Sequence, residues 1–154
     1  MDIETLINSS IHDLEIISLR VIEDDRGAVL HMLRCDSDLY SDFGELYFSE
    51  TNPGIIKAWK CNSKLTQLLA VPRGRIRLVI FDDRLDSSSK GKLQILEVGR
   101  PDAYQLIKIP NNLWYGFECI SNEPSLIANC TNGIHSPDNT TTKNYDDPSI
   151  PFSW

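Results

Sequence analysis

The stretch of residues 54–84 carries polar side chains at several positions within its β-type runs. In a strand every second side chain points to the same face, so about half of these polar groups would face the interior of a small sandwich or barrel. A barrel interior lined by polar groups is more often a binding cavity than a core. The stretch therefore predicts a cavity lined from this set: Lys57, Lys60, Asn62, Gln67, Arg75 and Arg77.

A second group capable of chemistry is the aromatic pair Trp114-Tyr115. Residues 110–112, Pro-Asn-Asn, precede the pair and Gly116 follows it, so the rings can sit at the mouth of a barrel. Tryptophan offers a stacking face, and tyrosine offers a phenol that can donate a proton. Both rings are equally typical of a small core, and residue type alone leaves the two interpretations open.

Metal ligation is not indicated by the histidines or the cysteines. The three histidines lie far apart in sequence, and the strand after Trp59 carries Lys60 and Asn62, which are poor ligands for a transition metal. None of the four cysteines is paired at C-x-x-C spacing, so they are interpreted as small buried or half-buried residues. We therefore predict no metal site and no other cofactor.

Length and charge limit the class of protein. The 154 residues fit one domain with a substantial core, and the hydrophobic fraction of 41% is ordinary for a globular protein. The net charge of -7 argues against nucleic-acid binding, which needs a basic face. No apolar run is long enough for a signal peptide or a membrane span, which predicts a cytoplasmic protein without membrane contact.

Short strands must position these groups. About nine or ten β-type runs alternate with turns, and almost no helical pattern occurs, so we expect an all-β jelly roll or related double-sheet barrel. The three runs at 55–60, 68–71 and 76–81 lie close together with Pro and Gly between them, which predicts a meander. The turn at 24–27 predicts a hairpin between strands 15–22 and 28–34.

The two ends of the chain differ from this pattern, although no linker or repeat divides residues 1–154. Residues 1–14 are expected to form either a short helix near Asp2–Leu6 or a flexible arm. Residues 131–154 are loop-like but carry Tyr145, Phe152 and Trp154, so we expect this segment to pack back on the barrel.

Five fragments carry a resemblance to a known family. They are Asp25-Arg26-Gly27, GIIKAWK, PRGRIRLVIFDDR, IPNNLWYGF and YDDPSIPFSW. In order and approximate spacing they resemble the dTDP-4-dehydrorhamnose 3,5-epimerase family, from about Val21 to Trp154. The most specific parts are Gly74–Arg84 and Ile109–Phe117.

The resemblance implies a fold, an activity and a setting. The fold would be a cupin-type jelly-roll barrel with little helix, commonly a homodimer. The activity would be metal-independent epimerisation or keto-isomerisation of a nucleotide-linked 4-keto deoxysugar. The setting would be the biosynthesis of surface polysaccharide, such as O-antigen and lipopolysaccharide.

When the family's motif positions are aligned with this sequence one by one, the position of the general base falls on Lys60. The family has a histidine at this position, in the sequence R-G-L-H. The aspartate that partners the histidine falls on Asp147, or on Asp146 if the loop slips by one residue. The resemblance therefore implies a Lys60–Asp147 pair in place of the family's His–Asp base.

Other family positions are also changed. The histidine of A-H-G-F falls on Tyr115, and the family's catalytic tyrosine falls near Asn129, so that phenol is missing. The arginine of R-G-L-H becomes Lys57 if the strand absorbs one extra residue. The full predicted substrate-binding set is Lys57, Asn62, Gln67, Arg77, Trp114 and Asn129.

Epimerisation beside a ketone needs a base to remove a carbon-bound proton and an acid to return one to the other face. A lysine has a reference pKa of about 10.4 and is protonated at neutral pH. Lys60 would then pair with Asp147, or stabilise and protonate an enolate, while Tyr115 acts from the opposite side. The predicted catalytic set is Lys60, Asp147 and Tyr115.

Three functions remain open on this sequence. The first is the epimerase or keto-isomerase described above. The second is a catalytically inactive barrel that binds a sugar nucleotide and serves as a partner or regulator in glycan assembly. The third is a structural jelly roll without a small ligand.

Overall fold

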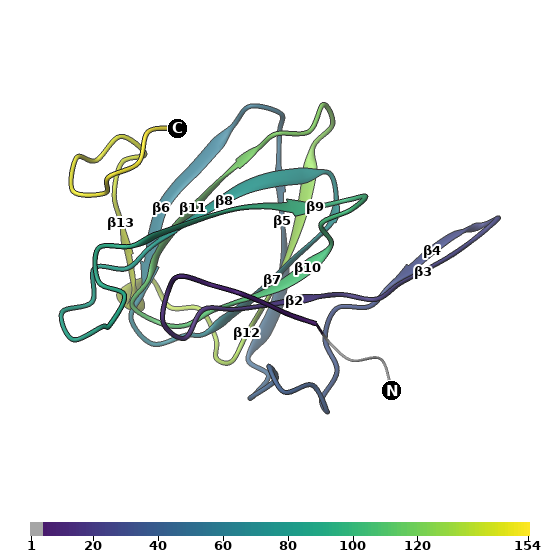
Figure 1. Cartoon of the computed structure of the whole chain (residues 1–154), viewed down its shortest axis with the longest axis horizontal. Coiled ribbons are helices and arrows are strands. Elements are labelled where there is room, and N and C mark those ends of the chain that lie inside the picture. Colours follow the sequence, from purple (N-terminus) through teal and green to yellow (C-terminus); the bar gives the residue numbers. More distant parts are fainter. Residues whose placement is uncertain (1–4) are drawn as a thin grey trace.

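The computed structural model describes residues 5–154 as two antiparallel sheets that face each other and a separate hairpin (Figure 1). The six-stranded sheet runs in the order β1 (Leu6–Ile7), β2 (Glu15–Ser18), β10 (Gln105–Ile109), β7 (Gln67–Arg73), β12 (Ser125–Thr131) and β5 (Glu45–Thr51). The five-stranded sheet runs in the order β13 (Thr140–Thr142), β6 (Ile56–Asn62), β11 (Trp114–Cys119), β8 (Arg75–Phe81) and β9 (Leu93–Gly99). This architecture is a cupin-type jelly roll, which confirms the predicted all-β fold.

Successive strands cross from one sheet to the other. β6 and β8 both pair with β11, whereas β7, between them in sequence, pairs with β10 and β12 in the opposite sheet. The predicted meander of three neighbouring strands is therefore wrong. The crossing lets the apolar inner faces of β7 and β8 cover each other across the barrel.

The corner between β7 and β8 requires Gly74. Its φ is +73°, and a Cβ there would lie 2.7 Å from the Cα of Ser125 on β12. Glycine adopts this conformation without the steric cost of a side chain. The turn that the sequence indicates at residues 72–74 is thus a bend between sheets rather than a hairpin loop.

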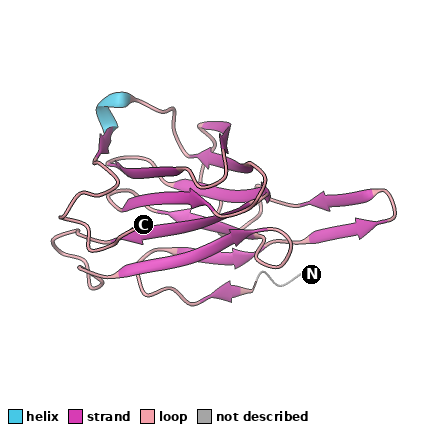
Figure 2. Ribbon diagram, turned by 90° about the horizontal axis from the view of Figure 1, so that it is seen from above, coloured by secondary structure: helices cyan, strands magenta, loops and turns pink. Residues whose placement is uncertain are grey.

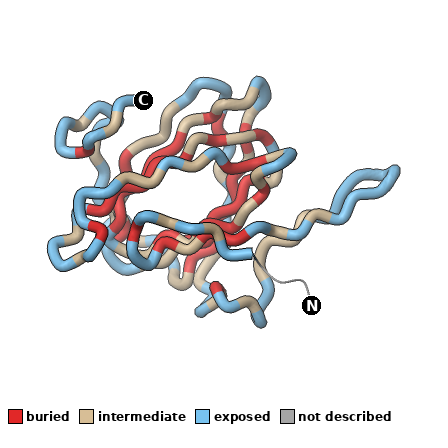
Figure 3. The backbone as a smooth tube through the Cα atoms, viewed as in Figure 1, coloured by how far each residue is buried: buried red, intermediate tan, exposed pale blue. Residues whose placement is uncertain are grey.

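The main core fills the space between the two sheets, where Figure 3 shows most of the buried backbone. Leu69 and Val71 of β7 meet Leu78 and Ile80 of β8 in one apolar cluster. A second cluster lies on the outer face of the five-stranded sheet around Trp59. Both faces of that sheet are consequently apolar.

The N-terminal segment packs on the barrel from β1 onward. β1 pairs with β2, and the side chains of Ile11 and Leu14 are buried in the main core. The part of the expected flexible arm or short helix at residues 1–4 lies outside the described residues.

A two-stranded hairpin projects from the barrel (Figures 1 and 2). It consists of β3 (Val21–Asp24) and β4 (Gly27–Leu30), joined at the turn that the sequence predicts. The predicted strand 15–22 is divided, because β2 ends at Ser18 and β3 begins at Val21.

The C-terminal segment follows β6 and then covers the outer face of its sheet. After the 3-10 turn Pro137–Asn139, β13 pairs with the end of β6. The rings of Phe152 and Trp154 then pack on Trp59, with centroids 6.2 and 5.1 Å away. No helix within residues 5–154 is long and apolar enough to cross a membrane.

Candidate functional site

A bulge in β6 turns two lysines toward the barrel interior. Lys57 lies opposite Phe117 and Lys60 opposite Tyr115, so β6 places two residues between them where β11 places only Gly116. Directly opposed residues in an antiparallel pair share a face of the sheet. Because Phe117 and Tyr115 belong to the main core between the two sheets, both lysines face inward.

A narrow cavity opens at this end of the barrel, with a volume of about 40 Å³. Side chains from both sheets and from the loop after β12 line it: Tyr47, Lys60, Asn62, Leu65, Gln67, Tyr115, Thr131, His135 and Thr140. Its floor is made of buried residues, including Gln67 and Tyr115, whereas its rim carries exposed Tyr47, Lys60 and His135. A ligand that reaches the opening therefore meets the three rim residues first.

Amide and phenol groups form a hydrogen-bond network at the floor. The Tyr115 hydroxyl donates to Gln67 Oε1 at 2.9 Å. Asn129 Nδ2 donates to the same Gln67 oxygen at 2.8 Å and to the Tyr47 hydroxyl oxygen at 2.7 Å. Asn129 Oδ1 is buried and has no hydrogen-bond partner among residues 5–154.

Burial raises the pKa of both phenols that line the cavity, Tyr115 and Tyr47. It raises the pKa of Tyr115 well above its usual range, against a smaller opposing effect of the hydrogen bond to Gln67. It also raises the pKa of Tyr47, which the hydrogen bond from Asn129 partly offsets. Both hydroxyls therefore keep their protons at neutral pH.

The two lysines differ in what they contact. Lys57 Nζ donates to the Glu50 carbonyl oxygen at 2.7 Å and to Ser49 Oγ at 3.2 Å, so it links β6 to β5. The side chain of Lys60 is exposed and makes no hydrogen bond or ion pair with any residue in the described range 5–154. Its ammonium group is available to a ligand at the rim.

Family membership follows from the sequence match. The dTDP-4-dehydrorhamnose 3,5-epimerase family profile matches residues 8–154. The chain belongs to this family. It is therefore a member of a family of sugar-nucleotide epimerases that serve glycan and polysaccharide biosynthesis.

Three relatives illustrate the similarity. The probable low-salt glycan biosynthesis epimerase Agl13 of Haloferax volcanii is 36% identical over 148 residues, which cover 93% of this chain and 89% of that protein. The spore coat polysaccharide biosynthesis protein SpsL of Bacillus subtilis is 32% identical, covering 85% and 87%. The crystal structure of a dTDP sugar isomerase from Desulfovibrio desulfuricans G20 is 45% identical, with a TM-score of 0.94 and coverage of 96% and 94%.

The structure does not bring the predicted Lys60–Asp147 pair together. Among residues 5–154, neither Asp147 nor Asp146 forms an ion pair with Lys60. Instead, the Asp147 carboxylate accepts hydrogen bonds from Ser149 N at 2.9 Å and from Ser149 Oγ at 2.5 Å, which hold its pKa below the ordinary value. The expectation of a contact inside the barrel is wrong.

The path of the C-terminal segment explains this separation. Lys143 and Trp59 exchange backbone hydrogen bonds beside β6, and the Trp59 indole then donates to the Tyr145 carbonyl oxygen at 3.1 Å. Because Trp59 lies on the outer face, the chain is drawn away from the cavity at this point. Asp147 lines a separate hollow of about 380 Å³ beside Phe152 and Trp154.

Two predicted substrate-binding residues also face outward. Arg77 forms an ion pair with Glu118 at 3.0 Å on the outer face of the sheet. Trp114 is buried in the outer cluster, where its indole donates to Asp83 at 3.1 Å. The structure thus places neither of them in the cavity, whereas Asn62, Gln67 and Asn129 lie in or directly beneath it.

Sequence reasoning missed Tyr47 and His135. Tyr47 lies on β5 and His135 in the loop after β12, and neither segment contains a motif that marks a site. Only the pairing of β5 with β12 brings Tyr47 beside Asn129. No local signal in the sequence identifies these two residues.

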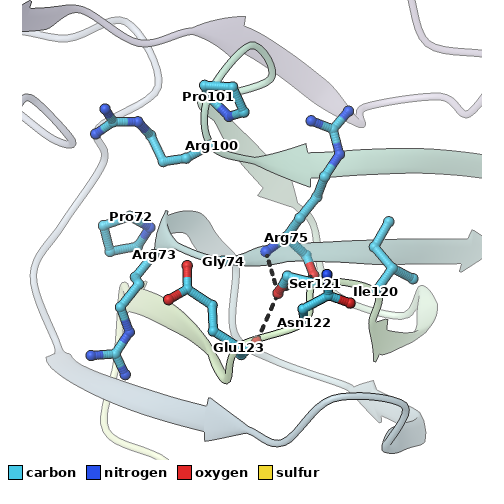
Figure 4. Close-up of a pocket in the computed structure, with 10 residues that line it drawn as sticks. All are labelled: Pro72, Arg73, Gly74, Arg75, Arg100, Pro101, Ile120, Ser121, Asn122 and Glu123. Atoms are coloured by element: carbon cyan, nitrogen blue, oxygen red, sulfur yellow. Dashed lines mark hydrogen bonds between the residues drawn. The ribbon is translucent and has the colours of Figure 1, made fainter.

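A larger hollow of about 540 Å³ lies at the other end of β7 (Figure 4). Arg73, Arg75 and Arg100 line it, but Figure 4 shows their guanidinium groups pointing away from one another. Each is paired with a carboxylate: Arg73 with Glu50, Arg75 with Glu97 and Asp102, and Arg100 with Glu23. These pairs neutralise the positive charge that an anionic ligand would need there.

Proposed function

We propose that this protein is a metal-independent epimerase or keto-isomerase of a nucleotide-linked 4-keto deoxysugar. The observation that carries the proposal is the unpaired ammonium group of Lys60, which stands at the mouth of a family barrel above a buried polar network. Similarity to a dTDP sugar isomerase at 45% identity supports a dTDP-linked substrate.

The chemistry follows from the charge that the reaction creates. Removal of a proton from a carbon next to the ketone leaves negative charge on the carbonyl oxygen. A fixed ammonium group at that oxygen stabilises the enolate, and we assign this role to Lys60. The imidazole of His135, at the same rim, is a suitable base for the first proton transfer.

The size of the cavity determines where the sugar would sit. A cavity of about 40 Å³ holds only a few water molecules, since one water needs roughly 10–15 Å³ of such a volume, and it is too small for a sugar. The sugar therefore lies over the opening in this proposal, in contact with the exposed rim. The buried floor residues orient the rim from below.

Deuterium exchange tests the proposed reaction directly. The protein is mixed in deuterated water with dTDP-, UDP-, GDP- and CDP-linked 4-keto deoxysugars, and the sugar is analysed by NMR. We expect deuterium at a carbon that flanks the ketone of at least one of them. Binding of such a sugar without any exchange would exclude the enzymatic function.

The alternative is a sugar-nucleotide-binding protein without catalytic activity that acts as a partner or regulator in the same pathway. The replacement of the family's histidine by Lys60 and the absence of its tyrosine near Asn129 favour this alternative. A sugar nucleotide would then bind at the rim without proton transfer.

The variant Lys60→Met discriminates between the two functions, since it removes the charge and keeps the stem of the side chain. Loss of a group that stabilises an oxyanion lowers kcat by about 100-fold or more. We expect this loss with less than about a tenfold change in affinity, while Lys90→Met, on the loop between β8 and β9 and outside the cavity lining, retains full activity. A change in affinity alone would instead support the binding function.

The biological setting is also part of the proposal. We place the reaction in the cytoplasm, in the supply of sugar nucleotides for a surface polysaccharide such as O-antigen or lipopolysaccharide. The names of the Haloferax and Bacillus relatives, which refer to glycan and spore coat polysaccharide biosynthesis, support a role of this kind.

We further propose that the protein forms a homodimer. β5 is the edge strand of the six-stranded sheet, and Leu46 and Phe48 on it are exposed. Ile22 and Val29 form a cross-strand pair on the projecting hairpin and are exposed as well. Apolar side chains on an edge strand and a projecting hairpin are typical of surfaces that a partner covers.

A further inference from the structure

The two phenols of the cavity differ in what their hydroxyl groups do. Tyr115 is 7% exposed and donates its only proton to Gln67. Tyr47 is 40% exposed, and its oxygen accepts a hydrogen bond from Asn129 while its own proton has no acceptor within residues 5–154. A phenol carries one donor, so Tyr47 alone of the two can donate to a ligand without breaking an existing bond.

Strand pairing places Tyr47 at the level of Asn129. The two residues are directly opposed in the register of β5 and β12, so their side chains lie on the same face of the sheet. In the family resemblance, the catalytic tyrosine falls near Asn129. A phenol is thus presented at this level by the neighbouring strand.

The floor of the cavity fixes this arrangement. Asn129 is 3% exposed, and its amide nitrogen is held between Gln67 and Tyr47. Asn129 Oδ1 remains unpartnered, although a buried polar atom without a partner is costly. A free acceptor beneath the rim is the complement of a hydroxyl group such as a sugar carries.

The two sheets contribute to opposite walls of the cavity. Tyr47 comes from the six-stranded sheet, whereas Lys60 comes from the five-stranded sheet. Epimerisation requires that one proton leaves one face of the sugar and another arrives at the opposite face. Lys60 can therefore hold the ketone oxygen from one wall while the Tyr47 hydroxyl approaches the sugar from the other.

We propose that Tyr47 is the proton donor of the reaction, a role that rests on the proposed function above. The base removes a proton from the carbon beside the ketone, and the electron pair of that C–H bond forms the enolate while the carbonyl π pair moves to oxygen. When the ketone re-forms, the carbon takes the proton of the Tyr47 hydroxyl on the opposite face. Water then reprotonates the phenolate, and the base releases its proton to solvent.

The variant Tyr47→Phe removes only this hydroxyl from a partly exposed side chain. With a 4-keto sugar nucleotide in deuterated water, the base can still remove a proton and return deuterium to the same face. We expect deuterium exchange with retained configuration, while the rate of forming the inverted sugar falls by about 100-fold or more. Thermal melting should match that of the wild type.

Two further variants serve as comparisons. Tyr104→Phe removes a buried phenol outside the cavity and should invert the sugar at the wild-type rate. Tyr115→Phe removes a phenol whose proton is committed to Gln67, and we expect a loss of less than about tenfold.

Four results would overturn the assignment. Inversion by Tyr47→Phe at the wild-type rate would leave the proposed function standing and exclude this donor. A larger loss of inversion in Tyr115→Phe than in Tyr47→Phe would assign the donor role to Tyr115. If Tyr47→Phe lost both deuterium exchange and inversion, Tyr47 would instead take part in the first proton transfer. Absence of exchange in the wild type, with a sugar that it binds, would exclude the proposed function as well.

Discussion

The two tyrosines that line the cavity differ in burial, and this difference determines whether their hydroxyl groups can donate to a ligand. Tyr115 and Tyr47 end in the same phenol, yet the buried hydroxyl is used to hold Gln67 and the partly exposed one is free to donate. Asn129 connects them, because its amide nitrogen bonds to both Gln67 and Tyr47. The properties of the rim thus depend on an amide at the floor of the cavity.

The pH profile of the variant Asn129→Ala tests this dependence. The amide hydrogen bond lowers the pKa of Tyr47, whereas burial and the negative charge of Glu45 raise it. Removal of the amide therefore raises the pKa of Tyr47 further. Activity that needs the protonated phenol is lost as the pH rises through this pKa, so we expect the alkaline limb of the kcat profile to move to higher pH.

The control for this measurement is Asn122→Ala, because Asn122 lines the hollow at the other end of β7 and not the cavity. Its profile should coincide with that of the wild type. Lys60, His135 and Tyr115 also line the cavity and are unchanged in both variants, so they do not produce a difference between them. An alkaline limb in Asn129→Ala that stays in place or moves to lower pH would contradict the role given to Asn129.

The bulge in β6 is the element that places the lysines. It gives β6 one residue more than β11 between two inward-facing pairs, so Lys57 and Lys60 both face the interior although three positions separate them. Regular alternation would have directed one of them outward. On the outer face, the side chain of Ala58 occupies the space above Gly116.

The variant Gly116→Ala tests the importance of this bulge for the fold. A Cβ at residue 116 meets Ala58 Cα at 3.1 Å and Trp154 Cζ2 at 3.0 Å, and it also overlaps the Ala58 Cβ. Overpacking of this kind costs about 1–3 kcal/mol of the free energy of unfolding, which urea denaturation measures. The double variant Ala58→Gly/Gly116→Ala should recover part of the loss, and unchanged stability of the single variant would refute the packing argument.

One of the two most specific parts of the family resemblance, Gly74–Arg84, serves the fold at the end of β8. Burial by itself would raise the pKa of Asp82, but hydrogen bonds from Arg84, Ser87 and Ser89 outweigh it and hold the pKa far below the ordinary value. The carboxylate is completely buried, and the arginine and two serines satisfy its charge. This motif therefore stabilises the loop between β8 and β9 and does not line the cavity.

The surface of the barrel is covered unevenly. The C-terminal segment covers the outer face of the five-stranded sheet, whereas the edge strand β5 and the projecting hairpin keep exposed apolar side chains. Tyr47 lies on the same edge strand as exposed Phe48. A partner on this edge would lie close to the rim of the cavity.

The variant Phe48→Glu tests the proposed homodimer. A charge placed in an apolar interface is left unpaired and desolvated, which weakens association. We expect light scattering to give twice the chain mass for the wild type and a large monomer fraction for the variant. Ile95→Glu, on the edge strand β9 of the other sheet, should remain dimeric, and a monomeric wild type would exclude the proposal.

The sequence alone determined the local structure and part of the site. Alternating runs and Pro–Gly turns depend on neighbouring residues, so most strands and the hairpin turn at residues 24–27 were predictable. The polar positions of β6 and β7 also identified Lys60, Asn62 and Gln67 as lining the cavity. The family motifs added the jelly roll.

Which strands pair and which faces point inward depend on contacts between segments far apart in the sequence. Both faces of β8 and β11 are apolar, because the C-terminal segment buries the outer one, so alternation cannot tell that Arg77 and Trp114 face outward. The same segment carries Asp147 away from Lys60. Tyr47 and Asn129 are 82 residues apart, and their contact exists because β5 closes the edge of the sheet beside β12, a pairing that no local pattern encodes.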